Sequence, residues 1–185
     1  MSSSPEPFLT VEDLDLMPDD GNRYELLGGE IQASKTPGLI HQTTSGEIYY
    51  SIKSFLKLNP IGVVLATPGI IFSNIDAVIP DLVFMTTETL GASVRDDRIH
   101  GNLDLAIEIL SPGADNARRD RVAKRYVYSK FGVKEYWVVD PAARQIEVYR
   151  LQENTLVLEA TLGEEQQITS MLMPGYNARV GDFFV

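Results

Sequence analysis

Cysteine is absent from this sequence of 185 residues, and histidine occurs only twice, as His41 and His100. Without thiols the chain can form no disulfide, no thiolate metal site and no cysteine nucleophile. The scarcity of histidine argues against a histidine-based zinc site. The P-loop, GxGxxG, HExxH and GxSxG patterns are also missing, so the common motifs of phosphate cradles, dinucleotide sites, zinc proteases and serine hydrolases are excluded. Any chemistry must rely mainly on carboxylates, amines and guanidinium groups.

Long hydrophobic runs are absent as well. No uninterrupted apolar stretch approaches 18 residues, so we expect no membrane-spanning helix. The opening residues, MSSSPEPFLT, have neither the basic region nor the apolar core of a signal peptide. We therefore expect a cytoplasmic protein in which residues 1–7 are frayed. A length of 185 residues suits a single domain, 1–185, that buries a sizeable core.

Positive charge is scarce, with 16 Lys and Arg against 26 Asp and Glu and a formal net charge of −10. This balance argues against a protein that coats nucleic acid by bulk electrostatics. One segment, RRDRVAKR, departs from it and carries Arg118, Arg119, Arg121, Lys124 and Arg125. The segment is either a solvated helix face or a basic stripe that binds nucleic acid, and composition leaves both interpretations open.

Hydrophobic spacing predicts two helices. The first covers 41–58, and the second runs from about 115 to 131 with Val122, Ala123, Tyr126 and Val127 on its apolar face. The polar, glycine-bearing segment 87–102 is typical of a loop.

Alternating and β-branched runs predict strands between these elements. Gly28-Gly29 separates two of them and indicates an N-terminal hairpin. A strand, a helix and a strand in succession favour a crossover with parallel pairing, so the fold class is mixed α/β. The predicted strands are 23–27, 30–34, 62–66, 70–73, 81–86, 103–110, 134–140 and a C-terminal hairpin of 145–151 and 156–162.

Glu108 lies in the middle of the predicted strand 103–110. This strand alternates, so Glu108 shares a face with Ala106 and Leu110. A buried ionised carboxylate costs several kcal/mol unless a cation, a metal or hydrogen bonds compensate it. At the edge of a sheet, however, Glu108 would face water and need no partner.

Asp81 and Lys124 are the residues that could meet Glu108. Asp81 opens the strand after Pro80, either as a turn residue or as a second carboxylate on a strand beside that of Glu108. On a helical wheel Lys124 lies at the shoulder of the apolar stripe, half turned toward the sheet. The alternative is a surface ion pair between Lys124 and Asp120, four residues earlier.

Two carboxylates and a lysine are the groups that a metal-dependent phosphodiesterase requires. Hard oxygen ligands bind Mg²⁺ or Mn²⁺ with several retained waters. The ion lowers the pKa of a bound water, and a nearby amine can orient that water or stabilise the transition state. Asp81, Glu108 and Lys124 are therefore the candidate catalytic residues, with Asp81 and Glu108 as metal ligands.

The ordered motifs of the chain resemble a known family. Over about residues 9–151 the sequence is similar to the restriction-endonuclease family within the PD-(D/E)XK nuclease superfamily. The matching pieces are Pro80-Asp81-Leu-Val-Phe, Leu105-Ala-Ile-Glu108-Ile-Leu-Ser-Pro112, Asp120-x-x-x-Lys124-x-x-x-Tyr128, Gly132-Val-Lys-Glu-Tyr-Trp-Val-Val-Asp140, Arg23-Tyr-Glu-Leu-Leu-Gly-Gly-Glu30 and His41-Gln42.

This resemblance implies a restriction-endonuclease-like fold, in which helices flank a central mixed sheet, here with extra hairpins at the N- and C-terminal ends. It implies Mg²⁺ as cofactor, with Mn²⁺ able to substitute, and DNA as a transient substrate. The superfamily pattern places a lysine two residues after the acid, where this chain has Leu110. Within the family the lysine is expected on the following helix, which makes Lys124 the candidate.

Further residues are weaker candidates for the same site. Glu25 and Glu30 on the first hairpin could approach the metal, His41 could lie at a helix N-terminus beside it, Asp120 could orient Lys124, and Tyr128 neighbours Lys124 on the helix. Each of them also has an ordinary surface, capping or packing role. Arg118, Arg119, Arg121 and Arg125 are the candidate nucleic-acid contacts.

Three functions remain open at this stage. The first is a Mg²⁺-dependent endodeoxyribonuclease, which by analogy with the superfamily would act as a homodimer because cutting both strands requires two sites. The second is a non-catalytic binding or regulatory module on a nuclease fold, favoured by the net charge and by Leu110. The third is a phosphodiesterase that acts on RNA or nucleotides.

Overall fold

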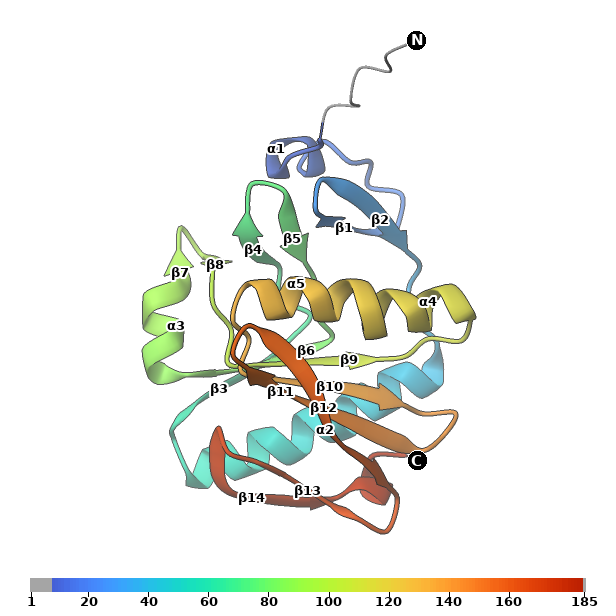
Figure 1. Cartoon of the computed structure of the whole chain (residues 1–185), viewed down its shortest axis with the longest axis vertical. Helices are drawn as coiled ribbons and strands as arrows, with labels where there is room; N and C mark the ends of the chain where they lie inside the picture. The colour runs from blue at the N-terminus through green and yellow to red at the C-terminus, as the bar shows by residue number, and fades with distance from the viewer. Residues whose placement is uncertain (1–7, 185) are drawn as a thin grey trace.

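Two six-stranded sheets form the frame of the molecule (Figure 1). The computed structural model describes residues 8–184, apart from the side chains of residues 114 and 115, so the expected fraying of residues 1–7 lies outside the described residues. Strand order is β12-β11-β10-β9-β6-β3 in the central sheet and β2-β1-β5-β4-β8-β7 in the upper sheet. A separate C-terminal hairpin pairs β13 with β14.

The central sheet carries the site and is mixed. β9 and β10 pair in parallel, whereas its other pairings are antiparallel. This confirms the predicted parallel crossover and the mixed α/β class. Its strands are β3 (Gly62–Ala66), β6 (Leu82–Thr86), β9 (Leu105–Ile109), β10 (Glu135–Asp140), β11 (Gln145–Gln152) and β12 (Thr155–Gly163).

The upper sheet begins with the predicted N-terminal hairpin. Gly28 and Gly29 have φ angles of 61° and 83°, the left-handed backbone that such a two-residue turn requires. The strands of this sheet are β1 (Arg23–Leu27), β2 (Glu30–Ser34), β4 (Ile70–Ser73), β5 (Asp76–Val78), β7 (Val94–Arg95) and β8 (Arg98–His100), and the separate hairpin consists of β13 (Gln167–Ser170) and β14 (Met173–Arg179).

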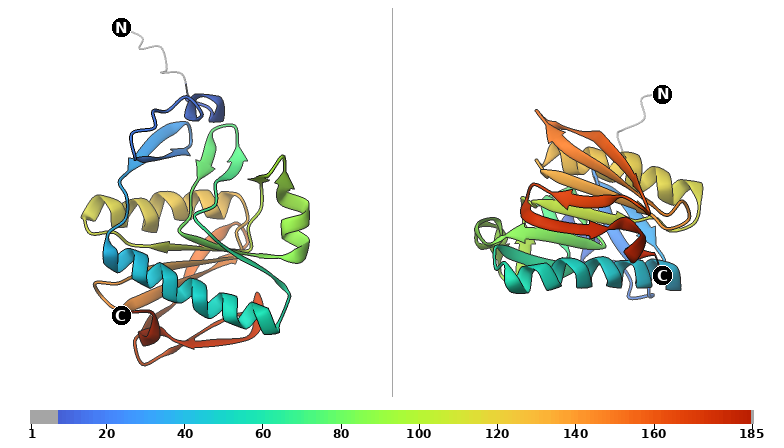
Figure 2. Two further views of the ribbon diagram at one scale, coloured as in Figure 1. Left: turned by 180° about the vertical axis from the view of Figure 1, so that it is seen from behind. Right: turned by 90° about the horizontal axis from the view of Figure 1, so that it is seen from below.

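Helices cover both faces of the central sheet (Figure 2). The 20-residue helix α2 (Leu39–Leu58) lies on one face, and the crossover between β9 and β10 lies on the other. None of the helices among the described residues is long and apolar enough to cross a membrane. The remaining helical segments are α1 (Val11–Leu14), α3 (Thr87–Ser93), α4 (Ala114–Arg118), the π-helix η1 (Arg119–Lys124), α5 (Arg125–Lys130) and the 3₁₀ turn η2 (Val180–Phe183).

Two apolar clusters fill the space on either side of the central sheet. Ile107 points toward α2 and packs with Ile48 and Ile52, while Ala106 faces α5 and packs with Tyr128. Alternation along β9 therefore buries both faces of the strand, as expected for a strand between two helical layers.

The prediction of a loop over 87–102 was wrong. This segment forms α3 and the short β7–β8 hairpin, because Thr86 caps α3 by accepting a hydrogen bond from the Thr89 amide. The predicted apolar face of the second helix was wrong in part: Val127 is buried, but Val122 and Tyr126 are 54% and 70% exposed. The buried face of that helix also carries polar residues, for a reason that the site makes clear.

Candidate active site

Strand register brings Asp81 and Glu108 together. β6 pairs antiparallel with β9, with Leu82 opposite Ile107. Continuing this register by one residue sets Asp81 opposite Glu108, and directly opposed side chains lie about 5 Å apart at Cβ. The Ile109 amide donates a hydrogen bond of 2.8 Å to Asp81 Oδ2, which fixes the carboxylate against the neighbouring strand.

Glu108 lies inside the sheet and not at its edge. β9 is flanked by β6 and β10, and Glu108 is only 3% exposed. The interpretation of Glu108 as a solvent-facing edge residue is therefore wrong. Asp81 is likewise buried, so it does not act as an exposed turn residue.

Lys124 supplies the cation that these buried carboxylates require. Its Nζ lies 2.9 Å from Glu108 Oε1 and 2.9 Å from Glu25 Oε1, which joins the helix to both sheets. Lys124 is 2% exposed, so the surface ion pair with Asp120 does not exist. Glu25 is further held by the Ile79 amide, which donates to Oε1 at 2.7 Å.

Two more predicted residues meet the carboxylates. The Tyr128 hydroxyl donates a 2.6 Å hydrogen bond to Glu108 Oε1, the same oxygen that Lys124 contacts. His41 Nε2 lies 3.0 Å from Asp81 Oδ2, near the start of α2. His41 Nδ1 is buried without a hydrogen-bond partner among the described residues.

A departure from regular α-helical geometry makes this arrangement possible. Between α4 and α5 the chain forms the π-helix η1, whose wider i→i+5 turns are often found at functional sites. As a result Asp120, Lys124 and Tyr128, spaced four apart, all turn inward and are buried. Val122 and Tyr126 are displaced to solvent because the carboxylates and not the apolar core determine which face is buried.

Asp120 belongs to the same buried cluster but does not contact Lys124 directly. Its carboxylate accepts a 3.1 Å hydrogen bond from Arg119 Nε, and its backbone oxygen accepts one from the Tyr136 hydroxyl. Burial raises the pKa of Asp120, although Lys124 and Arg119 oppose that rise. The hypothesis that Asp120 orients Lys124 thus stays a prediction that would have to act through charge.

The two central carboxylates differ in their protonation. Burial disfavours ionised Asp81, but the hydrogen bond and charge of His41 together with the Ile109 amide outweigh it and hold the Asp81 pKa below its usual range. Burial raises the pKa of Glu108 to about 8, assisted by repulsion from Asp81, Asp120 and Glu25, against the attraction of Lys124. Although burial alone would lower it, the pKa of Lys124 is raised by the surrounding carboxylates, so this amine stays protonated.

These shifts predict how stability depends on pH. The folded protein holds a proton on Glu108 between about pH 4.5 and 8 that the unfolded chain releases, so the free energy of unfolding falls as pH rises through this window. The slope from this group is at most about 1.4 kcal/mol per pH unit. Glu108→Gln removes it. Between pH 5 and 8, without divalent metal, the melting temperature should therefore fall more steeply with pH in the wild type than in the variant. Equal dependence of the two melting temperatures on pH would contradict the raised pKa of Glu108.

A small polar cavity opens onto the cluster. It has a volume of about 40 Å³, enough for an ion or a few waters. Asp81, Glu108, Lys124, Glu25 and His41 line it from the cluster side. Its wall also includes Arg23, Ser34, Lys35, Ser111 and Arg119.

Arg23 and Lys35 are members of this cavity that motif reasoning did not propose as site residues. Arg23 lies on β1, with its Nη1 4.0 Å from Asp81 Oδ1, and Lys35 directly follows β2. The signal that could have found them is their position, because both belong to the hairpin that carries Glu25. Their charges suit an anionic group at the mouth of the cavity.

Charge repulsion within the cluster would favour a bound cation. Four carboxylates, those of Glu25, Asp81, Glu108 and Asp120, surround one buried cation, Lys124, while Arg119 pairs with Asp120 and Arg23 lies 4.0 Å from Asp81. Burial together with repulsion from the neighbouring carboxylates raises the pKa of Glu108. A divalent ion at the cavity would relieve that repulsion.

The residues fit Mg²⁺, which needs few protein ligands, better than an ion that protein side chains surround completely. Within the described residues, no group of three or more His, Asp or Glu side chains closes on one point. Mg²⁺ is usually held by only one or two carboxylates together with waters and substrate oxygens, which Asp81 and Glu108 can provide. Their Oδ1 and Oε2 atoms have no hydrogen-bond donor among the described residues.

The basic segment does not form a single stripe. Arg118 is exposed, Arg119 reaches the cavity, and Arg125 lies 5.2 Å from the Tyr149 ring centre. Arg121 is paired with Asp140 at 3.0 Å and with Glu147 at 2.8 Å. The four candidate nucleic-acid contacts therefore point in several directions, and of these four only Arg119 lines the cavity beside Asp81 and Glu108.

Glu30 is not brought to the cluster. It is exposed at the start of β2 and lines a separate hollow beside Asp76 and Lys130. Glu25 lies in the middle of β1 on the strand's buried side, whereas Glu30 follows the glycine turn, so the hairpin carries the two residues to different places.

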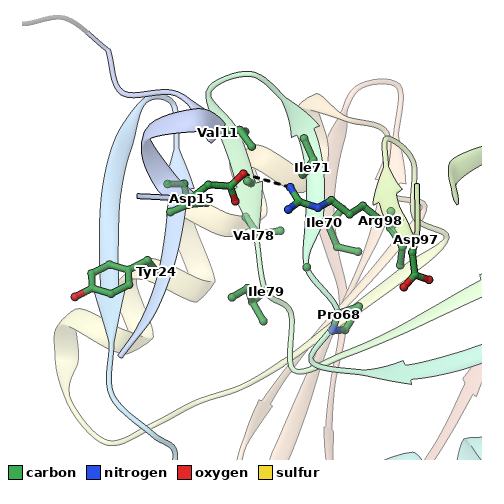
Figure 3. Close-up of a pocket in the computed structure, with 14 residues that line it drawn as sticks. Val11, Asp15, Tyr24, Pro68, Ile70, Ile71, Val78, Ile79, Asp97 and Arg98 are labelled. Carbon is green, nitrogen blue, oxygen red and sulfur yellow. Dashed lines mark hydrogen bonds and ion pairs between the residues drawn. The ribbon is translucent and has the colours of Figure 1, made fainter. Parts of the chain in front are cut away.

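A hollow on the upper sheet is a poor alternative site (Figure 3). It has a volume of about 380 Å³ and is lined mainly by aliphatic side chains such as Val11, Ile70 and Val78. Arg98 extends across it toward Asp15, with the ion pair at 3.5 Å. Its carboxylates, Asp15 and Asp97, are both exposed, and Asp15 is already paired with Arg98, so this hollow lacks the buried charges of the cluster.

Fold and site together define the class of protein. A mixed central sheet with opposed acids on adjacent strands and a lysine from the crossover helix is a restriction-endonuclease-like nuclease fold. The family described as "Putative restriction endonuclease" (Uma2) matches residues 11–181, and the chain belongs to this family. The resemblance seen in the motifs is thereby confirmed.

A solved structure shares the whole fold. The crystal structure of a protein from Anabaena variabilis, described as a "putative nuclease belonging to DUF820", superposes with a TM-score of 0.76 at 18% identity. The match covers 95% of this chain and 97% of that chain. At this identity the likeness shows the fold alone. No functionally curated protein matches this sequence.

Proposed function

We propose that this protein is a Mg²⁺-dependent endonuclease that hydrolyses DNA phosphodiester bonds at the Asp81, Glu108 and Lys124 cluster. Membership of a nuclease family gives the general class. The observation that carries the specific proposal is the burial of opposed Asp81 and Glu108, with a protonated Lys124 beside them, at a small polar cavity.

Each side chain has a physical task in this proposal. Asp81 and Glu108 would hold the ion, and His41 and the Ile109 amide keep the Asp81 carboxylate in position. When bound, the ion lowers the pKa of a water and neutralises charge that develops on the phosphate. Because Lys124 stays protonated it acts as a hydrogen-bond donor and cation toward the phosphate or the water, and not as a base.

The wall of the cavity suits the substrate backbone. Arg23, Lys35 and Arg119 offer positive charge to phosphate oxygens although the whole chain carries a net charge of −10. Local positive charge of this kind lets an acidic protein bind a phosphodiester, but few basic side chains are available to contact phosphates. We therefore expect weak binding that rises when a divalent ion reduces the negative charge of the cluster.

The experiment that tests the function uses the wild-type protein and four labelled substrates. Fluorescent DNA and RNA of the same sequence, each single-stranded and duplex, are incubated with Mg²⁺, with Mn²⁺ and with EDTA. The proposal expects internal cleavage of DNA with either ion and none with EDTA. Cleavage that persists in EDTA would overturn metal dependence, and cleavage of RNA alone would favour the RNA or nucleotide phosphodiesterase.

One observation favours the second candidate, a non-catalytic module. Lys124 already lies between Glu25 and Glu108 and so satisfies those carboxylates without a metal. If this interpretation is right, calorimetry with Mg²⁺ or Mn²⁺ gives no binding heat in the presence or absence of DNA. Binding of ions in proportion to the number of clusters, one cluster in each chain, would favour the enzyme.

We also infer that the active form in the cytoplasm is a homodimer, since one cluster can cut only one strand at a time. Light scattering of the purified protein tests this, because a dimer has twice the mass of the 185-residue chain. A monomer that nevertheless makes double-strand breaks would contradict the inference.

A further inference from the structure

A second hollow adjoins the catalytic cavity. It has a volume of about 650 Å³ and lies between the start of α2, the β9–α4 connection and the β10–β11 turn. His41 and Ser111 line both spaces, so the hollow continues directly from the site at which a phosphate would be held. A nucleotide bound by its phosphate in the cavity can therefore place its base in this hollow.

The wall of the hollow is largely apolar. Leu39 and Ile40, the first two residues of α2, are 80% and 65% exposed beside it. Leu110, Pro112 and Pro141 face it from the other side. Exposing large aliphatic side chains to water is unfavourable, and an apolar ligand surface that covers them would lower the free energy.

Polar groups are few and mostly engaged. Asp140 is held by Arg121 at 3.0 Å, so its charge is compensated. His41 Nδ1, in contrast, is buried without a partner at the junction of hollow and cavity. A ligand with a flat apolar body and a hydrogen-bonding edge would satisfy both the aliphatic wall and this nitrogen.

We propose that the hollow binds an unstacked nucleobase next to the scissile phosphate. This inference rests on the proposed function and deepens it by naming the substrate class: single-stranded or locally unpaired nucleic acid. A base inside a duplex is stacked on both faces and cannot enter a recess, so a duplex must first give up a few kcal/mol to expose one. Leu39 and Ile40 contact the base, and apolar side chains of this kind separate stacked bases in other proteins.

A binding experiment tests the inference without requiring cleavage. The protein is Asp81→Asn, which retains Lys124 and the basic wall, and the probe is a labelled 20-nucleotide DNA strand with Mg²⁺. A second probe has the same length and phosphates but abasic sugars throughout. Fluorescence anisotropy should give roughly fivefold tighter binding of the strand that carries bases, which corresponds to about 1 kcal/mol.

Matched variants locate the effect. Adding Leu39→Ala should bring the two probes within about twofold of each other. Adding Leu58→Ala, which removes an 85% exposed leucine at the far end of the same helix, should leave the fivefold difference unchanged. Both positions are exposed, so neither substitution should affect folding by more than about 0.5 kcal/mol.

The outcomes separate this inference from the proposed function. Equal binding of the two probes by Asp81→Asn would overturn the base-binding hollow while leaving a nuclease that holds only phosphates. A difference that survives Leu39→Ala would also overturn it, because the base would then bind elsewhere. Absence of binding to both probes, together with no cleavage by the wild type, would remove the proposed function itself.

Discussion

Asp81→Asn is expected to abolish metal-dependent cleavage of DNA, with a loss of at least about 10²–10³-fold in kcat. The substitution keeps the size of the side chain and leaves an oxygen to accept the Ile109 amide, but it removes one of the two charges that would hold the ion. It also removes the attraction that orients His41. Rates are measured on the DNA probe over a range of Mg²⁺ concentrations, since partial recovery at high Mg²⁺ would identify the loss as one of ion binding.

Asp76→Asn is the control for this variant. Asp76 is also buried and is paired with Lys130 at 2.9 Å, but it lies on β5 outside the cluster. Its pKa is also lowered: burial raises it, but the Lys130, Gly28 and Ser73 contacts prevail, so loss of its charge costs stability as well. Equal loss of cleavage in both variants would show that destabilisation and not the site was responsible, whereas normal cleavage by Asp81→Asn would refute the assignment.

Lys124→Met is expected to destabilise the protein by about 3–5 kcal/mol, the usual cost of leaving buried charges without their partner. For a chain of this size that corresponds to a fall in melting temperature of about 10 °C. The cause is that Glu25 and Glu108 would lose their shared cation at 2.9 Å, while Met conserves most of the lysine volume. Thermal melts at pH 9 without divalent metal measure the loss, because above its pKa of about 8 Glu108 is ionised in the folded wild type.

A double variant distinguishes charge from packing. If the loss is electrostatic, adding Glu108→Gln to Lys124→Met removes one uncompensated carboxylate and should recover a substantial part of the stability, so the two effects are not additive. Mg²⁺ should also raise the melting temperature of Lys124→Met more than that of the double variant, in which one ligand is missing. Additive losses would show that Lys124 stabilises the fold by packing alone.

The sequence was most informative where a local rule and the motif order agreed. Gly28-Gly29 predicted the N-terminal hairpin, and the alternation around Glu108 predicted β9 with both faces distinct. The order of the motifs also predicted a nuclease family, which the match over residues 11–181 bears out. These features are short-range, since a turn conformation or a period of two depends on neighbouring residues.

The sequence failed where long-range contacts overrode the local pattern. Val122 and Tyr126 fit an apolar helix face, yet the helix turns them to solvent because Lys124 and Asp120 are drawn inward by the carboxylates. No spacing rule predicts a π-helix, because its cost is repaid only by partners on other strands. The polar segment 87–102 likewise hid a capped helix.

What the sequence by itself determined is the inventory: the fold class, the family and the set of carboxylates, lysine, tyrosine and histidine that could carry chemistry. What only the tertiary structure decided is which of them meet. Glu25 reaches Lys124 and Glu30 does not, although the two differ by five positions, because the turn between them reverses the chain. Arg23 and Lys35 join the cavity for the same reason. A buried charge must be compensated by groups that the tertiary structure places beside it. Local sequence patterns do not determine the distance between residues that are far apart in the chain.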